Sequence, residues 1–296
     1  MKYNKVPLTF EKQVELLASR GLVVPDKKRA QEFLSRVNYY RLSAYCLPFA
    51  KSPHKFIDGT TFDDVAHLYE FDYQLRLVLD LALEHIEVYT RANLAYILAH
   101  KYGPFAHEDQ ANFFYNFKHT EFIDILRRET EYSREVFVGH HKSTYDEFPQ
   151  LPIWVAVEIM SFGCVSTLIE NGLKKEDIIA VSSLFGLHSK VFCSWLHTLS
   201  YIRNICAHHS RLWNRTLSLP VVLPKHDHWK GFNQQKMGAL VMAINAMLLR
   251  SCEPAHYKTW RESFERLIEG KPNVPHFHFS TGLPENWKEH PLWKRL

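Results

Sequence analysis

Apolar residues recur at helical spacing along most of this chain, and capping residues mark where the helices begin. Thr9 is an N-cap for a short helix over Phe10 to Ser19. Asp26 caps a second helix, which leads into the segment Tyr39-Tyr40-Arg41. Alternating β-branched runs are few and there are 11 glycines, so the pattern argues against an all-β fold.

The longest helical pattern begins at Thr61, which forms a capping box with Asp64. Apolar residues then continue at helical spacing to Tyr102, where Gly103-Pro104 ends the pattern. Glu87 and Arg91 stand four residues apart within it. We expect them to form a salt bridge that is structural rather than catalytic.

Further helices are expected after this one. They are two short helices within 110–135, a central apolar helix over 153–169, a short helix over 174–184, a long one from 189, one over 233–250 and a last one over 253–268. Residues 50–59 and 137–152 are predicted to be loops. The adjacent His140 and His141 have no Cys or carboxylate partner at a useful spacing, so we expect no metal site and no cofactor.

The predicted fold class is therefore all-α. A helical bundle carries an N-terminal helical appendage, and an irregular C-terminal strap is held across it by tryptophans. The expected domains are residues 1–60, 61–252 and 253–296.

Composition agrees with a globular protein, since 46% of the residues are hydrophobic and 14% are aromatic. The five cysteines are scattered and form no Cys-x-x-Cys pair, which predicts neither disulfides nor a zinc site and suits a reducing cytoplasm. The N-terminus has no apolar signal core, and no apolar run reaches the length of a bilayer. We therefore expect a cytoplasmic protein with no membrane partner.

Candidate chemistry gathers between Tyr201 and Arg215, which continues the helical pattern from Ser189. At roughly 100° per residue, the stripe expected in the core consists of Trp195, Leu199, Ile202, Cys206 and Trp213. The face expected opposite consists of His197, Ser200, Asn204, His208, Arg211 and Arg215. Arg203 lies between the two faces, and His209 lies nearer the core stripe, where we expect a structural role.

The charges around this stretch predict a phosphate-binding surface. No Asp or Glu occurs between Asp177 and Asp227, and the basic residues within that interval are Lys190, Arg203, Arg211, Arg215 and Lys225. A histidine side chain exchanges protons near neutral pH. An arginine guanidinium donates two hydrogen bonds to phosphate oxygens, and an asparagine amide can orient the imidazole or the ribose. Arg203, Asn204 and His208 therefore predict RNA cleavage without metal, in which the 2′-hydroxyl that DNA lacks attacks the adjacent phosphate.

The string from Arg203 to Arg215, Arg-Asn-Ile-Cys-Ala-His-His-Ser-Arg-Leu-Trp-Asn-Arg, closely resembles the Abi-like (AbiD/AbiF) abortive-infection family. That family belongs to the HEPN ribonuclease superfamily, whose signature is Arg, four to six residues, then His. Residues 38–45, 151–163 and 283–293 resemble the family's N-terminal, middle and C-terminal motifs.

The resemblance implies a HEPN-like four-helix bundle with Arg203, Asn204 and His208 as catalytic residues. It implies a homodimer in which the motif helices of two chains face each other. It also implies a toxin-like effector of bacterial antiviral defence, restrained by a small structured RNA or a protein antitoxin. The residues expected to bind RNA are Arg211, Arg215, Lys190, His197 and Arg41.

Several alternatives stay open at this point. Arg211 and Arg215 suit RNA contact and dimer contact equally. Tyr39 and Tyr40 either stack on unpaired bases or pack against the bundle, and the frequency of aromatic residues in cores favours packing. The main alternative function is a non-catalytic RNA-binding HEPN-like module that holds a structured small RNA. A scaffold without nucleic acid would leave the acid-free stretch unexplained.

Overall fold

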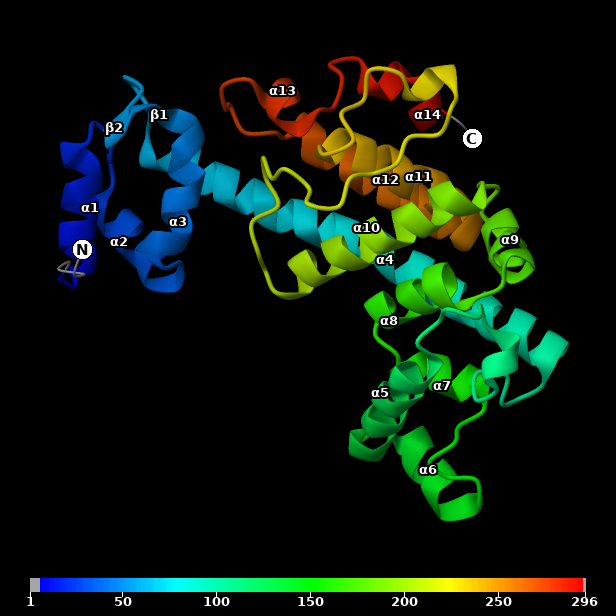
Figure 1. Cartoon of the computed structure of the whole chain (residues 1–296). Coiled ribbons are helices and arrows are strands. Elements are labelled where there is room, and N and C mark those ends of the chain that lie inside the picture. Colours follow the sequence, from blue (N-terminus) through cyan, green and yellow to red (C-terminus); the bar gives the residue numbers. More distant parts are fainter. Residues whose placement is uncertain (1–5, 295–296) are drawn as a thin grey trace. The chain divides into compact units, whose positions relative to one another are not determined.

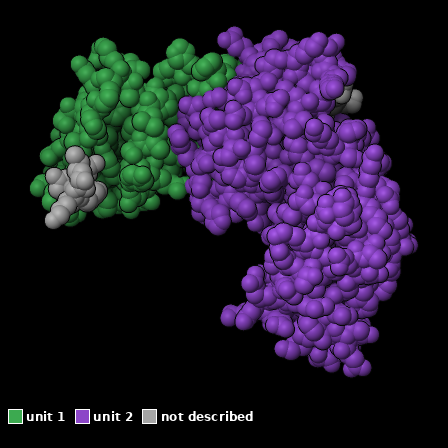
Figure 2. All heavy atoms as spheres, viewed as in Figure 1, with its two compact units in different colours: residues 1–77, 262–280 green, residues 78–261, 281–296 purple. Residues whose placement is uncertain are grey.

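The computed structural model describes residues 6–294 and consists mainly of helices, which confirms the all-α prediction (Figure 1). It divides into two compact units, each built from two chain segments (Figure 2). The first unit comprises residues 1–77 and 262–280, and the second comprises residues 78–261 and 281–296. The unit boundaries fall inside the helices α4 (Phe62–Tyr102) and α12 (Pro254–Glu269). The domains expected from sequence, with boundaries at 60/61 and 252/253, stay a prediction.

The first unit is assembled from short capped helices. Its elements are α1 (Phe10–Ser19), α2 (Lys27–Arg36), α3 (Tyr39–Cys46), the 3₁₀ turn η1 (Leu47–Phe49), strands β1 (Ala50–Ser52) and β2 (Lys55–Phe56), the start of α4, the end of α12 and most of α13 (Phe277–Thr281). Thr9 and Asp26 cap α1 and α2 as predicted, accepting from the backbone N–H groups of Lys12 and Arg29. The loop predicted over residues 50–59 is wrong in part, because β1 and β2 pair there as an antiparallel hairpin.

The second unit contains the remaining elements. They are the rest of α4, η2 (Gln110–Asn112), α5 (His119–Tyr132), α6 (Val136–Thr144), α7 (Ile153–Ile159), α8 (Phe162–Thr167), the π-helical turn η3 (Leu168–Gly172), α9 (Lys175–Leu184), α10 (Ser189–Ala207), η4 (Asp227–Trp229), α11 (Met237–Ser251), the start of α12, η5 (Trp287–Glu289) and α14 (Pro291–Lys294).

Parts of α4, α10, α11 and α12 run beside one another as the core of the second unit (Figure 1). The Trp260 indole of α12 donates to the Val78 carbonyl of α4 at 3.0 Å, and the Tyr257 hydroxyl donates to Asn245 of α11 at 3.0 Å. The tail packs through its tryptophans as predicted, because Trp287 and Trp293 are buried with their ring centroids 4.8 Å apart. Its predicted irregular conformation is wrong in part, because the tail contains the short helices α13 and α14 and the turn η5. Burial of large aromatic side chains contributes much of the stability of such a bundle.

Three helix predictions need correction. The loop expected over 137–152 contains α6, which Val138 anchors in the core with 2% exposure. The single helix expected over 153–169 is broken, because the Ser161 hydroxyl accepts from the Cys164 N–H at 3.1 Å and starts α8 anew. Within 110–135 one of the two expected helices is the short turn η2.

Three further features concern chemistry and membranes. Across residues 6–294, no single helix is long and apolar enough to cross a membrane, although α9 and α10 meet that test jointly across a 72° bend. The same residues contain no group of three or more His, Cys, Asp or Glu side chains placed to hold a metal ion. All five cysteines are free thiols.

The second unit contains a buried histidine that makes its stability depend on pH. His107 is 0% exposed, and burial lowers its pKa to about 4, the neighbouring His119 and Arg127 adding to the effect. The carboxylate of Glu108 lies 3.8 Å away but does not reverse the effect of burial. The folded protein therefore resists a proton that the unfolded chain takes up below about pH 6.5.

We expect the free energy of unfolding to be greatest above about pH 6.5 and to fall by about 3 kcal/mol as the pH drops toward 4. Urea unfolding of the wild type and of the His107→Gln protein across this interval measures the effect. The difference between the two proteins should shrink as the pH falls. A difference that does not vary with pH would contradict the lowered pKa.

Candidate functional site

The predicted motif lies where α10 ends. His208 is the C-cap, and His209 has a left-handed backbone with φ of +52°. The His209 N–H donates to the Cys206 carbonyl at 3.0 Å and the Ser210 N–H donates to the Ile205 carbonyl at 2.9 Å. These two bonds form a Schellman motif, which satisfies carbonyls at a helix end. The helix therefore stops one residue before His208.

This ending corrects the helical face drawn from the sequence. Arg211 and Arg215 lie in the loop beyond the helix, so they do not share a helical face with His208. Ser200, expected on the polar face, is 5% exposed. The core stripe is confirmed, and Trp213 is fully buried although it is not helical. The His209 side chain is exposed rather than near the core, and the backbone of this residue forms the turn that ends the helix.

The conformation of His209 gives a stability prediction. A β-branched side chain in the left-handed region costs about 1–2 kcal/mol, whereas glycine adopts it freely. We expect the His209→Val protein to be less stable than the His209→Gly protein by about that amount. Thermal unfolding of the two proteins provides the measurement. Equal melting temperatures would show that the turn is not held in this conformation.

The three candidate catalytic residues come together on the last turn of α10 and its cap. Asn204 and His208 are exposed, and the His208 N–H donates to the Asn204 carbonyl at 3.0 Å. Within the described part of the chain, neither the Asn204 amide nor the His208 imidazole forms a hydrogen bond or ion pair. The expected side-chain pair between them is therefore not formed. Both groups are available to a ligand.

Arg203 is held by the neighbouring helix α4. Its Nε lies 3.6 Å from Oε2 of Glu87, and 40% of its side chain is exposed. Glu87 also pairs with Arg91, so the predicted salt bridge is confirmed, and both of these side chains are buried. The Nη1 group of Arg91 donates to the backbone carbonyl of Val157. One carboxylate thus fixes two arginines.

The surroundings of Arg203 are more acidic than the sequence suggested. A cavity of about 350 Å³ lies beside it, and its lining consists of Asp80, Glu84, Glu87, Val88, Arg91, Glu158 and Arg203. Burial raises the pKa of the Asp80 carboxyl, and the nearby Glu84 and Glu87 raise it further against the opposing effect of Arg203. The stretch is free of acids in sequence only, because α4 brings carboxylates to it in space.

This arrangement limits where a phosphate can bind. Carboxylates repel it from the cavity, and the carbonyl end of a helix offers no backbone donors to an anion. The remaining position is the outer side of Arg203, beside Asn204 and His208. Side-chain cations must supply the binding there.

The Arg215 side chain lies in the loop after α10 and contacts Tyr201 of that helix. Its Nη1 donates to the Tyr201 hydroxyl at 3.1 Å, and its Nε donates to the Arg211 carbonyl at 2.9 Å. Hydrogen bonds from Ser218 and Arg215 lower the pKa of Tyr201, the contribution of Ser218 being the largest. Arg211 and Arg215 therefore stay near the motif, although not for the helical reason that predicted it.

The other predicted RNA-binding residues lie further away. Lys190 is in the first turn of α10, and His197 is at its middle, where its Nδ1 lies 3.9 Å from Oε2 of Glu170. Arg41 belongs to the first unit, with its guanidinium carbon 5.8 Å from the Tyr69 ring centroid. Its contact with RNA stays a prediction.

The two tyrosines beside Arg41 behave differently from each other. Tyr39 is half-buried and its hydroxyl accepts from Arg20 at 2.9 Å, whereas Tyr40 is 86% exposed. Packing therefore accounts for Tyr39 and not for Tyr40.

Sequence reasoning missed the carboxylates that surround Arg203. Glu87 was expected only to pair with Arg91, and Asp80 was not singled out. Both are far from Arg203 along the chain, and helical periodicity carries no information on which faces of two helices meet. The only sequence signal for these carboxylates was the helical spacing that places them on one face of α4.

Comparison with known proteins supports one identification. No curated protein and no solved structure matches the chain. A sequence model of the Abi-like protein family matches residues 32–214, which is more than half of the 296 residues. The match includes the segments 38–45 and 151–163 and all but the last residue of the string from Arg203 to Arg215, while the tryptophan-containing ending lies outside it. The chain belongs to the Abi-like protein family, which suggests a role in abortive-infection defence.

Proposed function

We propose that this protein is a metal-independent endoribonuclease of the HEPN type that acts as a toxin-like effector in abortive infection. The observation that carries the proposal is the exposed end of α10, where Arg203, Asn204 and His208 are displayed on one turn and its cap. The family supports the role in defence.

The chemistry follows from the side chains. The His208 imidazole takes the proton of a ribose 2′-hydroxyl, and that oxygen attacks the adjacent phosphorus. The Arg203 guanidinium stabilises the negative charge that develops on the phosphoryl oxygens. Asn204 orients the ribose or the imidazole. The 5′-oxygen then leaves with a proton, and the product carries a 2′,3′-cyclic phosphate.

One chain supplies a single such set, whereas acid and base must act on opposite sides of the phosphorus. We therefore propose a two-fold dimer in which two α10 ends face each other. Size-exclusion chromatography with light scattering should give a mass of twice 34.9 kDa. A strict monomer that still cuts RNA would contradict the dimer while leaving the nuclease activity in place.

The proposed nuclease cuts RNA, whereas the alternative function, a non-catalytic RNA-binding module, only binds it. Purified protein incubated with total RNA should generate new ends, with an unchanged rate when EDTA is added. Sequencing those ends after brief expression in cells would identify the substrate and cut site together. If the wild type binds RNA but cuts none, with or without divalent metal, the binding module is the correct function.

A further inference from the structure

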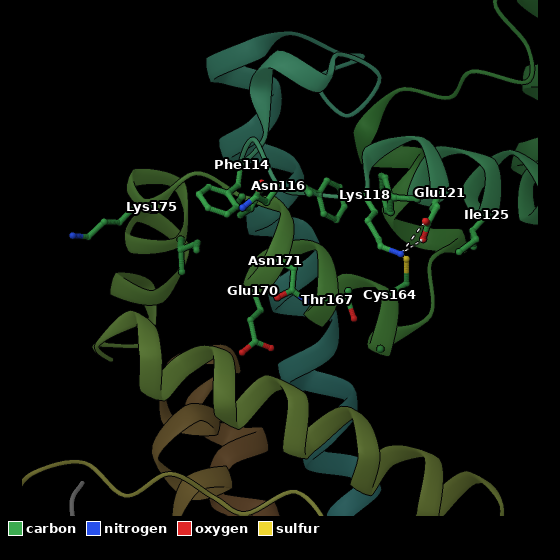
Figure 3. A pocket seen from close by; sticks show the side chains of 15 residues that line it. Phe114, Asn116, Lys118, Glu121, Ile125, Cys164, Thr167, Glu170, Asn171 and Lys175 are labelled. Carbon is green, nitrogen blue, oxygen red and sulfur yellow. Dashed lines mark hydrogen bonds and ion pairs between the residues drawn. The ribbon is translucent and has the colours of Figure 1, made fainter.

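A second hollow in the same unit suits a ligand that the proposed catalytic residues do not touch. It is a cavity of about 790 Å³ between the segment after η2, helix α5 and the turn η3 (Figure 3). Ligand pockets commonly have volumes of about 300–1,000 Å³. Its walls include the rings of Phe114, Phe117 and Phe122, and its polar groups include Asn116, Asn171 and Glu170.

Backbone contacts hold the two sides of this cavity together. The Phe114 N–H donates to the Gly172 carbonyl at 2.8 Å, and Phe113 forms an isolated β-bridge with Leu173. A Cβ at Gly172 would lie 3.2 Å from the Phe117 ring, so a glycine allows that ring to pack directly on the turn. The turn η3 is π-helical, a rare conformation found frequently at functional sites. The aromatic wall is thus pre-formed.

The cavity lies beside the face of α10 that carries the proposed catalytic residues. Glu170 points toward the α10 ribbon (Figure 3), and its Oε2 lies 3.9 Å from Nδ1 of His197. On a helix, Asn204 and His208 follow His197 within about 20° of the same line. The distance along the axis from His197 to His208 is roughly 16 Å, which about five stacked nucleotides span, or fewer in a stretched strand.

We propose that this cavity binds an unstacked nucleobase of single-stranded RNA, a few nucleotides from the bond that is cut. The proposal rests on the nuclease function proposed above. Aromatic rings stack on any base, and planar amides and a carboxylate read base edges by hydrogen bonding. The described side chains of Asn116 and Asn171 form no internal hydrogen bond, so their amides are available to a base.

The charge of Glu170 predicts which bases the cavity prefers. A carboxylate accepts from exocyclic amino groups such as N4 of cytosine, and uracil has no amino group. We therefore infer a preference for cytosine and adenine over uracil, and a weaker preference in the Glu170→Gln protein. Lys175 extends outward from the mouth, where it can meet the phosphate backbone (Figure 3).

The test measures binding in the His208→Ala background, in which RNA is expected to stay uncut. The probes are fluorescein-labelled oligoribonucleotides of cytidine, adenosine and uridine of equal length, followed by fluorescence anisotropy. Adding Phe114→Ala should weaken cytidine binding by about 5- to 150-fold, the value of one base-stacking contact. Asn171→Ala should reduce the preference for cytidine over uridine. The matched control is Tyr132→Ala. Tyr132 is the last residue of α5, is 79% exposed and lies outside the cavity, so this change should alter neither the affinity for cytidine nor the preference over uridine.

Thermal unfolding of each protein shows that the fold is intact, and ultraviolet crosslinking of the cytidine oligonucleotide should label the segment from Phe114 to Phe117. Unchanged affinity and base preference in Phe114→Ala and Asn171→Ala, with RNA still cut by the wild type, would overturn the base pocket alone. A wild type that neither binds nor cuts RNA would overturn both proposals. An apolar dye that binds in the cavity and is not displaced by RNA would overturn the base pocket in favour of an apolar ligand.

Discussion

Replacement of His208 by alanine is expected to slow RNA cleavage by about 10²- to 10⁴-fold, the usual contribution of a positioned general acid or base. The imidazole is exposed at the C-cap of α10, so its removal leaves no buried cavity and the fold should be retained. RNA affinity should change by no more than a few-fold, because the arginines that hold phosphate remain. Gel-based cleavage of single-stranded RNA, with binding measured in parallel, provides both values.

The adjacent imidazole is the matched control. His209 follows His208 directly, and its backbone forms the left-handed turn, a conformation that glycine also adopts. The His209→Gly protein should therefore cut RNA at nearly the wild-type rate. Equal loss in the two proteins would assign the effect to the helix end rather than to proton transfer.

Arg203 tests the electrostatic part of the same mechanism. Arg203→Ala should slow cleavage by about 10²- to 10³-fold, comparable to the loss of one donor that stabilises developing charge. Arg203→Lys keeps the charge but loses the paired donors and the contact geometry with Glu87, so we expect only partial recovery. Full activity in Arg203→Ala would exclude the proposed role.

Replacement of Glu87 by glutamine is expected to destabilise the protein by about 3 kcal/mol or more, because it leaves the buried Arg91 as an unpaired charge. Urea unfolding gives the measurement. The neighbouring Glu84→Gln protein is the control, since that side chain is exposed and lines the same cavity, and we expect a change of about 0.5 kcal/mol or less.

The double protein Glu87→Leu, Arg91→Met should recover much of the lost stability, because apolar replacement of a buried pair is often neutral. Its cleavage rate is informative for a different reason. Arg203 would lose the carboxylate 3.6 Å from its Nε, so slow cleavage by a stable double protein would show that Glu87 positions Arg203. Wild-type stability in Glu87→Gln would contradict the buried pair.

Local capping chemistry explains why much of the fold could be predicted. Thr9, Asp26 and the pair of Thr61 with Asp64 start helices where expected, and their hydrogen bonds are formed. Gly103 ends α4 with φ of +91°, as its sequence position indicated. These signals act within a few residues, so they can be read without knowing the tertiary structure.

Two features of the site could not be predicted for the same physical reason. The end of α10 lacks the usual glycine, and His209 adopts the left-handed turn that would have marked it. Asp80, Glu84 and Glu87 beside Arg203 come from α4 and Glu158 comes from α7, so only the packing of separate helices brings these carboxylates there. Similarly, Val138 is the single buried residue of α6, so the sequence of this helix has no apolar periodicity that would predict it.

The central claim is that a 2′-hydroxyl attacks the neighbouring phosphate with help from Arg203 and His208. The most direct test is a DNA oligonucleotide that contains one ribonucleotide within a base context found to be cut, incubated with the protein in EDTA. We predict one cut, on the 3′ side of that ribose, with a 2′,3′-cyclic phosphate end, and no cut in the His208→Ala protein. Cleavage of the all-deoxy strand, or a cut that leaves a 5′-phosphate, would contradict it.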